Sequence, residues 1–194
     1  YLSEMMNYPG VLFKDPNVME KIAIAHRLGK PVDGHAPGLR GAEAIQYIQA
    51  GITTDHECFT LDEALHKVEN GMKILIREGS AARNFDALHP LIQTHPTMVM
   101  FCSDDKHPDE LMTGHINKIV ARAVAIGYDL FDVLRCASIN PITHYKIPTG
   151  CLRIGDPADF IIVKNLKEFE VVATYVDGIC LIENGKSKLR FRYC

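Results

Sequence analysis

The stretches "PVDGHAPGL" (residues 31–39) and "TTDHECF" (residues 53–59) each run from a short extended segment into a histidine. The histidines are His35 and His56, which lie 21 residues apart. That spacing is too long for one face of a helix and too short for two separate domains. It is typical of successive strand–helix units, so both histidines are expected at the ends of neighbouring strands.

The chain around these stretches alternates between helical and extended patterns. Apolar residues recur at helical spacing in segments 18–29, 39–51, 60–71, 108–127 and 129–139. Short extended runs predict strands at 30–35, 52–57, 72–78 and 97–105. The alternation predicts an α/β fold with a parallel sheet, and the short strands favour a barrel ringed by helices. A doubly wound open sheet stays an alternative, although the glycine-rich nucleotide loops of that fold are absent from the sequence.

The pattern changes after about residue 146. The rest of the chain is rich in β-forming residues, and "DG" at 177–178 lies between two apolar runs, which is a strong hairpin signal. We therefore predict two parts, a partial barrel over 1–145 and a β-type segment over 146–194.

Composition excludes several classes of function. The formal net charge of −3 gives no basic surface for nucleic acid, and no apolar run is long enough to span a membrane. None of the six cysteines forms a C-x-x-C pair, which favours free thiols and a cytoplasmic location. A nucleobase deaminase of the type that binds zinc through P-C-x-x-C is excluded for the same reason.

Reactive groups of parallel barrels project from the carboxyl ends of the strands. The residues expected there are Glu4, His35, His56, Glu57, Arg77, Glu78, Ser80, Asp104 and Asp105. Imidazole and carboxylate ligands together suit Zn, Mn or Fe better than Ca or Mg. Some of these residues have structural roles as alternatives to a role in the site. Asp105 is expected to cap the following helix, and Arg77 could pair with Glu78.

A family resemblance is carried by long segments spread over essentially the whole chain. These are "PVDGHAPGLRG", "AGITTDHE", "MKILIREGSAARN", "FCSDDKHPDEL", "GHINKIVARAVAIG" and "GCLRIGDPADFIIVKNL". They closely resemble the adenine deaminases of the amidohydrolase superfamily. The resemblance implies about strands 4–8 of a distorted (β/α)8 barrel, with 146–194 forming part of a composite β-sandwich.

The resemblance also implies a reaction, the hydrolysis of adenine to hypoxanthine and ammonia. It implies a binuclear centre that holds Mn or Fe, with Zn as an alternative, and a purine base as the partner. Glu4, His35, His56 and Asp104 resemble the metal ligands. Asp104 is then the expected proton carrier, Glu57 or Glu78 protonates the purine ring, and Arg77 and Ser80 orient it.

One family motif is missing, because no H-x-H tripeptide occurs in the sequence. We therefore expect a fragment that begins near the fourth barrel strand and has no useful deaminase activity alone. Open strand edges would favour self-association, so a homo-oligomer is an open alternative. Two other functions also stay open, namely another amidohydrolase acting on a cyclic amide or imidazolone, and a non-catalytic binding fragment of the barrel.

Overall fold

The computed structural model describes residues 1–189, so residues 190–194 of the predicted second part, Cys194 included, lie outside the described residues. Within 1–189, a parallel sheet has the strand order β1-β2-β3-β4-β5. Its strands are β1 (Leu2–Met5), β2 (Val32–Gly34), β3 (Ile52–Asp55), β4 (Lys73–Arg77) and β5 (Val99–Cys102). The predicted alternation of strands and helices is confirmed. β1 and β5 do not pair with each other, so this sheet is open, and its assignment to about strands 4–8 of a (β/α)8 barrel stays a prediction.

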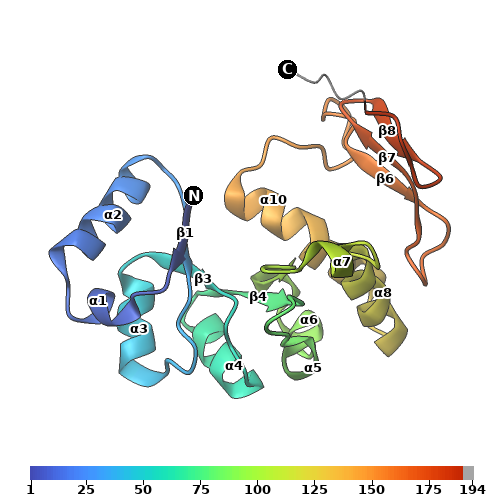
Figure 1. The fold of residues 1–194 in the computed structure, drawn as a ribbon. Helices are drawn as coiled ribbons and strands as arrows, with labels where there is room; N and C mark the ends of the chain where they lie inside the picture. The colour runs from blue at the N-terminus through green and yellow to red at the C-terminus, as the bar shows by residue number, and fades with distance from the viewer. Residues whose placement is uncertain (190–194) are drawn as a thin grey trace.

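Helices connect the strands and lie around the outside of the sheet (Figure 1). The helices are α1 (Tyr8–Leu12), α2 (Pro16–Arg27), α3 (Gly41–Gln49), α4 (Leu61–Glu69), α5 (Phe85–Leu88), α6 (Leu91–Thr94), α7 (Pro108–Leu111), α8 (Ile116–Ile126), α9 (Leu130–Leu134) and α10 (Asn140–Tyr145). A 3₁₀ turn covers Pro96–Met98 and a π-helical turn covers Arg135–Ile139. No helix in the described part of the chain has the length and apolar character needed to cross a membrane.

Two predicted helices differ from the observed ones. The segment 108–127 is split into α7 and α8, with Gly114 at φ +145° between them. The segment 129–139 continues instead through the π-helical turn into α10. Pro141 lies in the first turn of α10, where its ring would crowd the carbonyl group of Ala137 in a regular α-helix. The wider π turn removes that conflict and lets the helix continue to Tyr145.

The parallel sheet is packed by two hydrophobic clusters. One joins β1, β2 and their helices, with Ile22 and Tyr47 fully buried at its centre. The other joins β4, β5 and the later helices around Ile76 and Phe85. The two clusters meet near β3 and α4. Thr60 caps the N-terminus of α4, because its hydroxyl oxygen accepts a hydrogen bond from the backbone N–H of Glu63.

The second part is a four-stranded antiparallel sheet within residues 160–187 (Figure 1). Its strands are β6 (Phe160–Val163), β7 (Val171–Val176), β8 (Ile179–Glu183) and β9 (Lys186–Ser187). The predicted hairpin at 177–178 is confirmed, with Asp177 at φ +49° and Gly178 at φ +75°, as a tight primed turn requires. A second layer of a sandwich stays a prediction.

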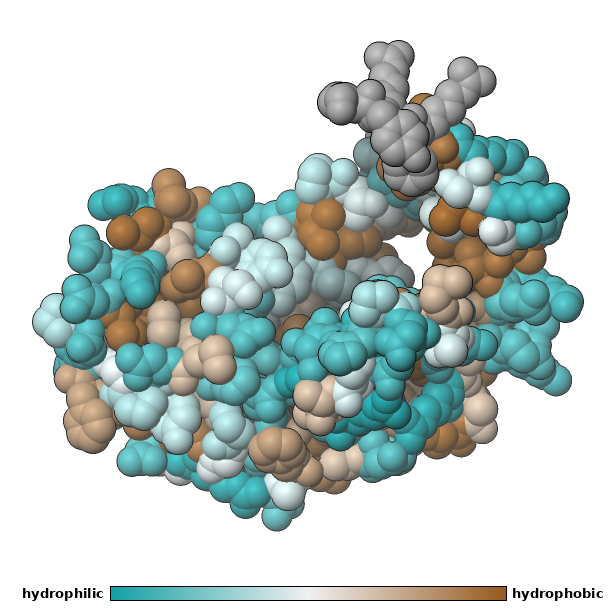
Figure 2. Space-filling view, viewed as in Figure 1, coloured by the Kyte–Doolittle hydropathy of each residue, from teal (hydrophilic) through white to brown (hydrophobic). Residues whose placement is uncertain are grey.

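Apolar side chains remain exposed on this second sheet, among them Ile161, Ile162 and Ile179. Figure 2 shows this apolar surface on the second sheet, whereas hydrophilic residues cover most of the rest of the molecular face in view. The five cysteines within residues 1–189 are unpaired, as predicted: Cys58, Cys102, Cys136, Cys151 and Cys180.

Candidate metal centre

The candidate ligands come from separate strands at one edge of the parallel sheet. Glu4 lies in β1, His35 follows β2 directly, and His56 follows β3 directly. Asp104 comes two residues after β5. Glu4 and Asp104 have left-handed backbone conformations, at φ +42° and φ +45°. Non-glycine residues held in such conformations cluster at functional sites, and here they turn both carboxylates toward the histidines.

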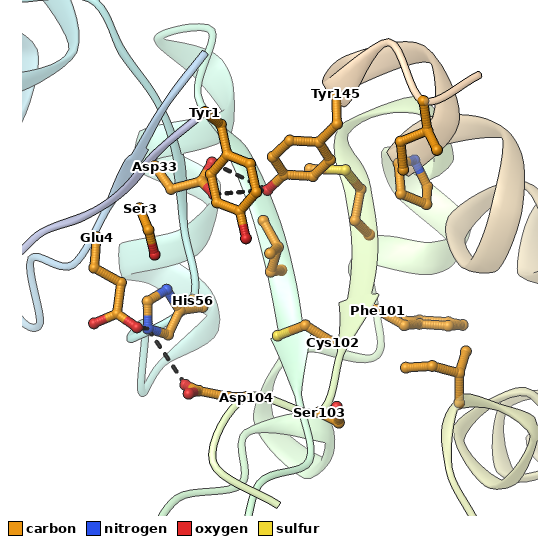
Figure 3. Close-up of a pocket in the computed structure, with 15 residues that line it drawn as sticks. Tyr1, Ser3, Glu4, Asp33, His56, Phe101, Cys102, Ser103, Asp104 and Tyr145 are labelled. Atoms are coloured by element: carbon orange, nitrogen blue, oxygen red, sulfur yellow. Dashed lines mark hydrogen bonds and ion pairs between the residues drawn. The ribbon is translucent and has the colours of Figure 1, made fainter. Parts of the chain in front are cut away.

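These side chains converge. His35 Nδ1 lies 3.5 Å from Glu4 Oε2, and His56 Nε2 lies 3.4 Å from Asp104 Oδ2. The two imidazole rings are 5.3 Å apart between centroids. Glu57 joins the group, with its Oε1 3.5 Å from His56 Nε2. Figure 3 shows Glu4 and Asp104 approaching the ring of His56 from two sides.

The histidine nitrogens that face the cluster lack hydrogen-bond partners among the described residues. Both His35 Nδ1 and His56 Nε2 are buried and make no hydrogen bond within residues 1–189, although carboxylate oxygens lie 3.5 Å and 3.4 Å away. Buried polar atoms nearly always have a hydrogen-bond partner. Two histidine nitrogens that lack one and face the same point therefore indicate a site for a bound ion. Three carboxylates but only one guanidinium, that of Arg77, lie around that point. The excess negative charge favours a bound cation. Two imidazoles with two or three carboxylates fit a divalent transition metal.

Arg77 ends β4 and reaches into the same cluster. Its Nη1 contacts Glu57 and lies 2.8 Å from Asp104 Oδ2. Its Nη2 lies 3.1 Å from Asp105 Oδ1. The alternative pairing of Arg77 with Glu78 is therefore not the one observed. Arg77 holds the two carboxylates that lie closest to His56 Nε2.

Glu78 and Ser80 make their contacts outside this cluster. Glu78 accepts a hydrogen bond from the backbone N–H of Phe85 and lies 3.4 Å from the guanidinium of Arg122. Ser80 Oγ donates to Glu110, 2.7 Å away, and accepts from the backbone N–H of His107. Both residues thus fasten the loop that follows β4.

The prediction that Asp105 caps the following helix is wrong. Its carboxylate accepts hydrogen bonds from the backbone N–H groups of Ser80 and Ala81, in the loop after β4. These bonds and Arg77 lower the pKa of Asp105. The helix begins only at Pro108 and has no side-chain cap. Asp105 therefore joins two neighbouring loops.

A cavity of about 550 Å³ lies beside the cluster. Glu4, His56 and Asp104 line one end of it, and Asp33 and Tyr145 line the other end (Figure 3). The hydroxyl group of Tyr145 donates to Asp33, 3.0 Å away, and burial raises the pKa of Asp33. The cavity leaves room for a small planar molecule next to the candidate ligands.

Asp33 and Tyr145 are cavity residues that sequence reasoning missed. Asp33 had a usable signal, because residues 33 and 35 share one face of an extended chain. Tyr145 had none, since it lies 112 residues from Asp33 in the sequence. Its contribution depends on the packing of α10 against the sheet.

Known proteins match the chain closely but only over part of their length. An adenine deaminase of Sulfurovum sp. is 59% identical over 189 residues, which is 97% of this chain and 35% of the relative. An adenine deaminase of Methanosarcina mazei is 57% identical over 96% of this chain and 34% of the relative. The chain thus spans about a third of the length of these curated relatives.

Solved structures share the fold at low sequence identity. The β-aspartyl dipeptidase of Fervidobacterium islandicum AW-1 matches with a TM-score of 0.69 and 21% identity, over 93% of this chain and 54% of that one. An enamidase of the amidohydrolase superfamily matches with a TM-score of 0.63 and 14% identity, over 88% and 51%. The model of the amidohydrolase family covers residues 1–180. Because that model matches most of the chain, the chain belongs to the amidohydrolase family.

Proposed function

We propose that this chain supplies one side of the active site of an adenine deaminase, which converts adenine and water into hypoxanthine and ammonia. One observation carries the proposal: the unpaired nitrogens of His35 and His56 meet Glu4 and Asp104 beside a cavity. The names of the relatives, which are 52–59% identical, support adenine as the substrate.

Glu4, His35, His56 and Asp104 would hold the metal. The resemblance favours Mn or Fe in a binuclear centre, and Zn suits the same donors. When bound, such an ion lowers the pKa of a coordinated water and makes it a nucleophile at neutral pH. The chain's own residues then have to orient the purine and move protons.

Asp104 is the proposed proton carrier. It accepts one proton of the attacking water and gives it to the amino group at C6, which leaves as ammonia when the C6–N bond breaks. Arg77 supports this role because its Nη1 lies 2.8 Å from Asp104 Oδ2 and so fixes the position of the carboxylate. A mobile carboxylate would transfer the proton less efficiently.

Glu57 is the proposed donor of a proton to ring atom N1. The carboxyl group recovers that proton from the second O–H bond of water as the C6 carbonyl forms. Its distance of 3.5 Å from His56 Nε2 supports this role over Glu78, which engages Phe85 and Arg122. Arg77 and Ser80 as purine-orienting residues, a cytoplasmic location and a homo-oligomer remain parts of the proposal.

The activity can be tested by grafting. In the adenine deaminase of Sulfurovum sp., the matching segment is replaced by this chain. The hybrid (grafted) enzyme is then assayed with Mn²⁺ on three substrates: adenine, an imidazolone and a cyclic amide. We expect hypoxanthine and ammonia from adenine alone. Ring opening of the other substrates would instead support a different amidohydrolase. A graft that folds, binds metal and turns over none of them would support a binding function.

The isolated 194-residue chain, outside the hybrid enzyme, is expected to bind metal but to release no ammonia from adenine. The physical reason is that a binuclear centre needs the H-x-H ligand pair, which the sequence lacks. Elemental analysis after dialysis measures the bound metal, and an ammonia assay with excess Mn²⁺ measures turnover. Turnover close to that of the grafted enzyme would contradict the expectation.

Two glutamate variants of the grafted enzyme separate the candidates for ring protonation. We expect Glu57→Gln to lower kcat by about 10²-fold or more, since a positioned general acid contributes at least that much. Glu78→Gln is expected to act chiefly on stability through its contacts with Phe85 and Arg122. Steady-state kinetics on adenine measures both variants. A larger fall in kcat for Glu78→Gln would reverse the assignment.

A further inference from the structure

A fully buried lysine lies behind the metal centre. Lys67 of α4 has a side chain that is 1% exposed, and its Nζ donates to Asp55 Oδ2 at 2.7 Å and to Glu63 Oε1 at 2.7 Å. It also donates to the carbonyl oxygen of Ala36 at 2.8 Å. Buried lysines are rare, and this one has these three oxygen acceptors close to its ammonium group, with Cys58 Sγ farther away at 3.6 Å.

These contacts join the two loops that carry the histidines. On the first loop, Lys67 binds the carbonyl oxygen of Ala36, the residue after His35. Where the second loop begins, it binds Asp55, which is the last residue of β3 and the residue before His56. One ammonium group therefore bridges the immediate neighbours of both imidazoles.

The two carboxylates extend the bridge to backbone groups of both loops. Glu63 accepts from the N–H of Gly38 on the first loop and from the N–H of Phe59 on the second. Asp55 Oδ1 accepts from the N–H of Glu57 at 2.8 Å. Every member of this network thus holds main-chain atoms within a few residues of a proposed ligand.

The network is not a second metal site, although Asp55, Cys58 and Glu63 have suitable spacing. The ammonium group of Lys67 already occupies the position of a cation between them. Burial alone would lower the pKa of Lys67, but the charge of Asp55 and the hydrogen bonds to both carboxylates raise it above its ordinary value. The lysine therefore stays charged at the centre of the network.

Stability alone is a weak reason to bury such a group. A buried ion pair pays a large desolvation penalty, and apolar replacements of similar volume are often neutral or stabilising. Apolar packing, however, does not fix the position of backbone N–H and C=O groups in the way that directed hydrogen bonds do. The benefit of the network lies in the placement of the two loops.

We infer that Lys67 is a positioning residue, which sets the separation of His35 and His56 by tying their loops together and so tunes metal affinity from outside the ligand set. The inference rests on the proposed metal centre. Partners behind the ligands of a metal commonly change its affinity by about 10–100-fold when they are replaced.

The test uses the 194-residue chain, with Mn²⁺ and Co²⁺ as probes. Wild type, Lys67→Met and Glu63→Gln are titrated with Mn²⁺ against a chromophoric chelator, and the visible spectrum of bound Co²⁺ reports ligand geometry. We expect Lys67→Met to raise the Kd about 10–100-fold and to shift the Co²⁺ bands. Glu63→Gln, which keeps the side-chain shape, should raise the Kd less.

Val68→Ala is the matched control, because Val68 neighbours Lys67 on α4 and packs into the hydrophobic core. It should lower the denaturant midpoint and leave Kd and spectrum unchanged. Equal Kd values for wild type and Lys67→Met, or an equal loss in Val68→Ala, would overturn the inference. If Lys67→Met does not fold, Glu63→Gln decides alone, and an unchanged Kd overturns it. Absence of metal binding by wild type would instead refute the proposed metal centre.

Discussion

Asp104→Asn in the grafted enzyme is expected to lower kcat for adenine by about 10²–10⁴-fold, which is the usual contribution of a positioned proton carrier. Asparagine keeps the shape of the side chain and an oxygen acceptor for Arg77, but it cannot take up a proton. Asp104 Oδ2 lies 3.4 Å from His56 Nε2, so some loss of metal affinity should accompany the change. Assays are therefore run at saturating Mn²⁺, with bound metal measured in the same samples.

The matched control is Asp109→Asn. Asp109 lies in the first turn of α7, five residues farther along the same segment, and is exposed. The same chemical change at that position should leave kcat unaltered. A fall in kcat of less than about tenfold for Asp104→Asn with metal fully bound would exclude it as the proton carrier.

Gly34→Ala is expected to lower the free energy of unfolding by about 1–3 kcal/mol, as overpacking in a core does, and also to weaken metal binding. A Cβ atom at position 34 would overlap the carbonyl oxygen of Thr54 on β3. It would also lie 3.1 Å from the ring of Tyr47. Backbone cannot give way as a flexible side chain can, so β2 and β3 would have to separate.

Such a separation would act directly on the metal centre, because His35 is the next residue. Tyr47 transmits the shift further, since its hydroxyl group accepts from the N–H of His35 and donates to the carbonyl oxygen of Met5, next to Glu4. Urea unfolding of the apo chain measures the loss of stability. Titration with Mn²⁺ measures the loss of affinity.

Gly127→Ala is the control for Gly34→Ala, because it makes the same substitution at a glycine without close neighbours. Gly127 ends α8 at φ +107°, with open space where a Cβ would lie. Alanine there should lower stability by about 1 kcal/mol through backbone strain and should leave metal affinity unchanged. If Gly34→Ala and Gly127→Ala affect metal affinity equally, close packing at Gly34 does not support the site.

Several features followed from local sequence signals. Helical spacing marked most of the helices, and "DG" marked the hairpin at 177–178, because periodicity and tight turns depend on residues close together in the chain. His35, His56 and Asp104 were predicted to converge for a more general reason. Parallel strands bring their carboxyl ends to one edge, so position along each unit was enough.

Other features depended on distant packing. The sequence left Glu57 and Glu78 equal as candidates for ring protonation, although Glu57 lies beside His56 and Glu78 contacts Arg122. Lys67 had a weak signal, because it falls within the buried stripe of α4 beside Ala64 and Val68. Its partners on two loops could not be read from that helix, since they lie 12 and 31 residues away.

By itself, the sequence determined the alternation of strands and helices, the change to a β-rich part near residue 146, and the residue types expected at the strand ends. These properties depend on periodicity and on neighbouring residues. Only the tertiary structure decided which carboxylates face His56, where Arg77 binds, and that Lys67 joins the loops of both histidines. Such choices depend on side-chain direction across elements that are far apart in the chain, and no local pattern encodes that direction.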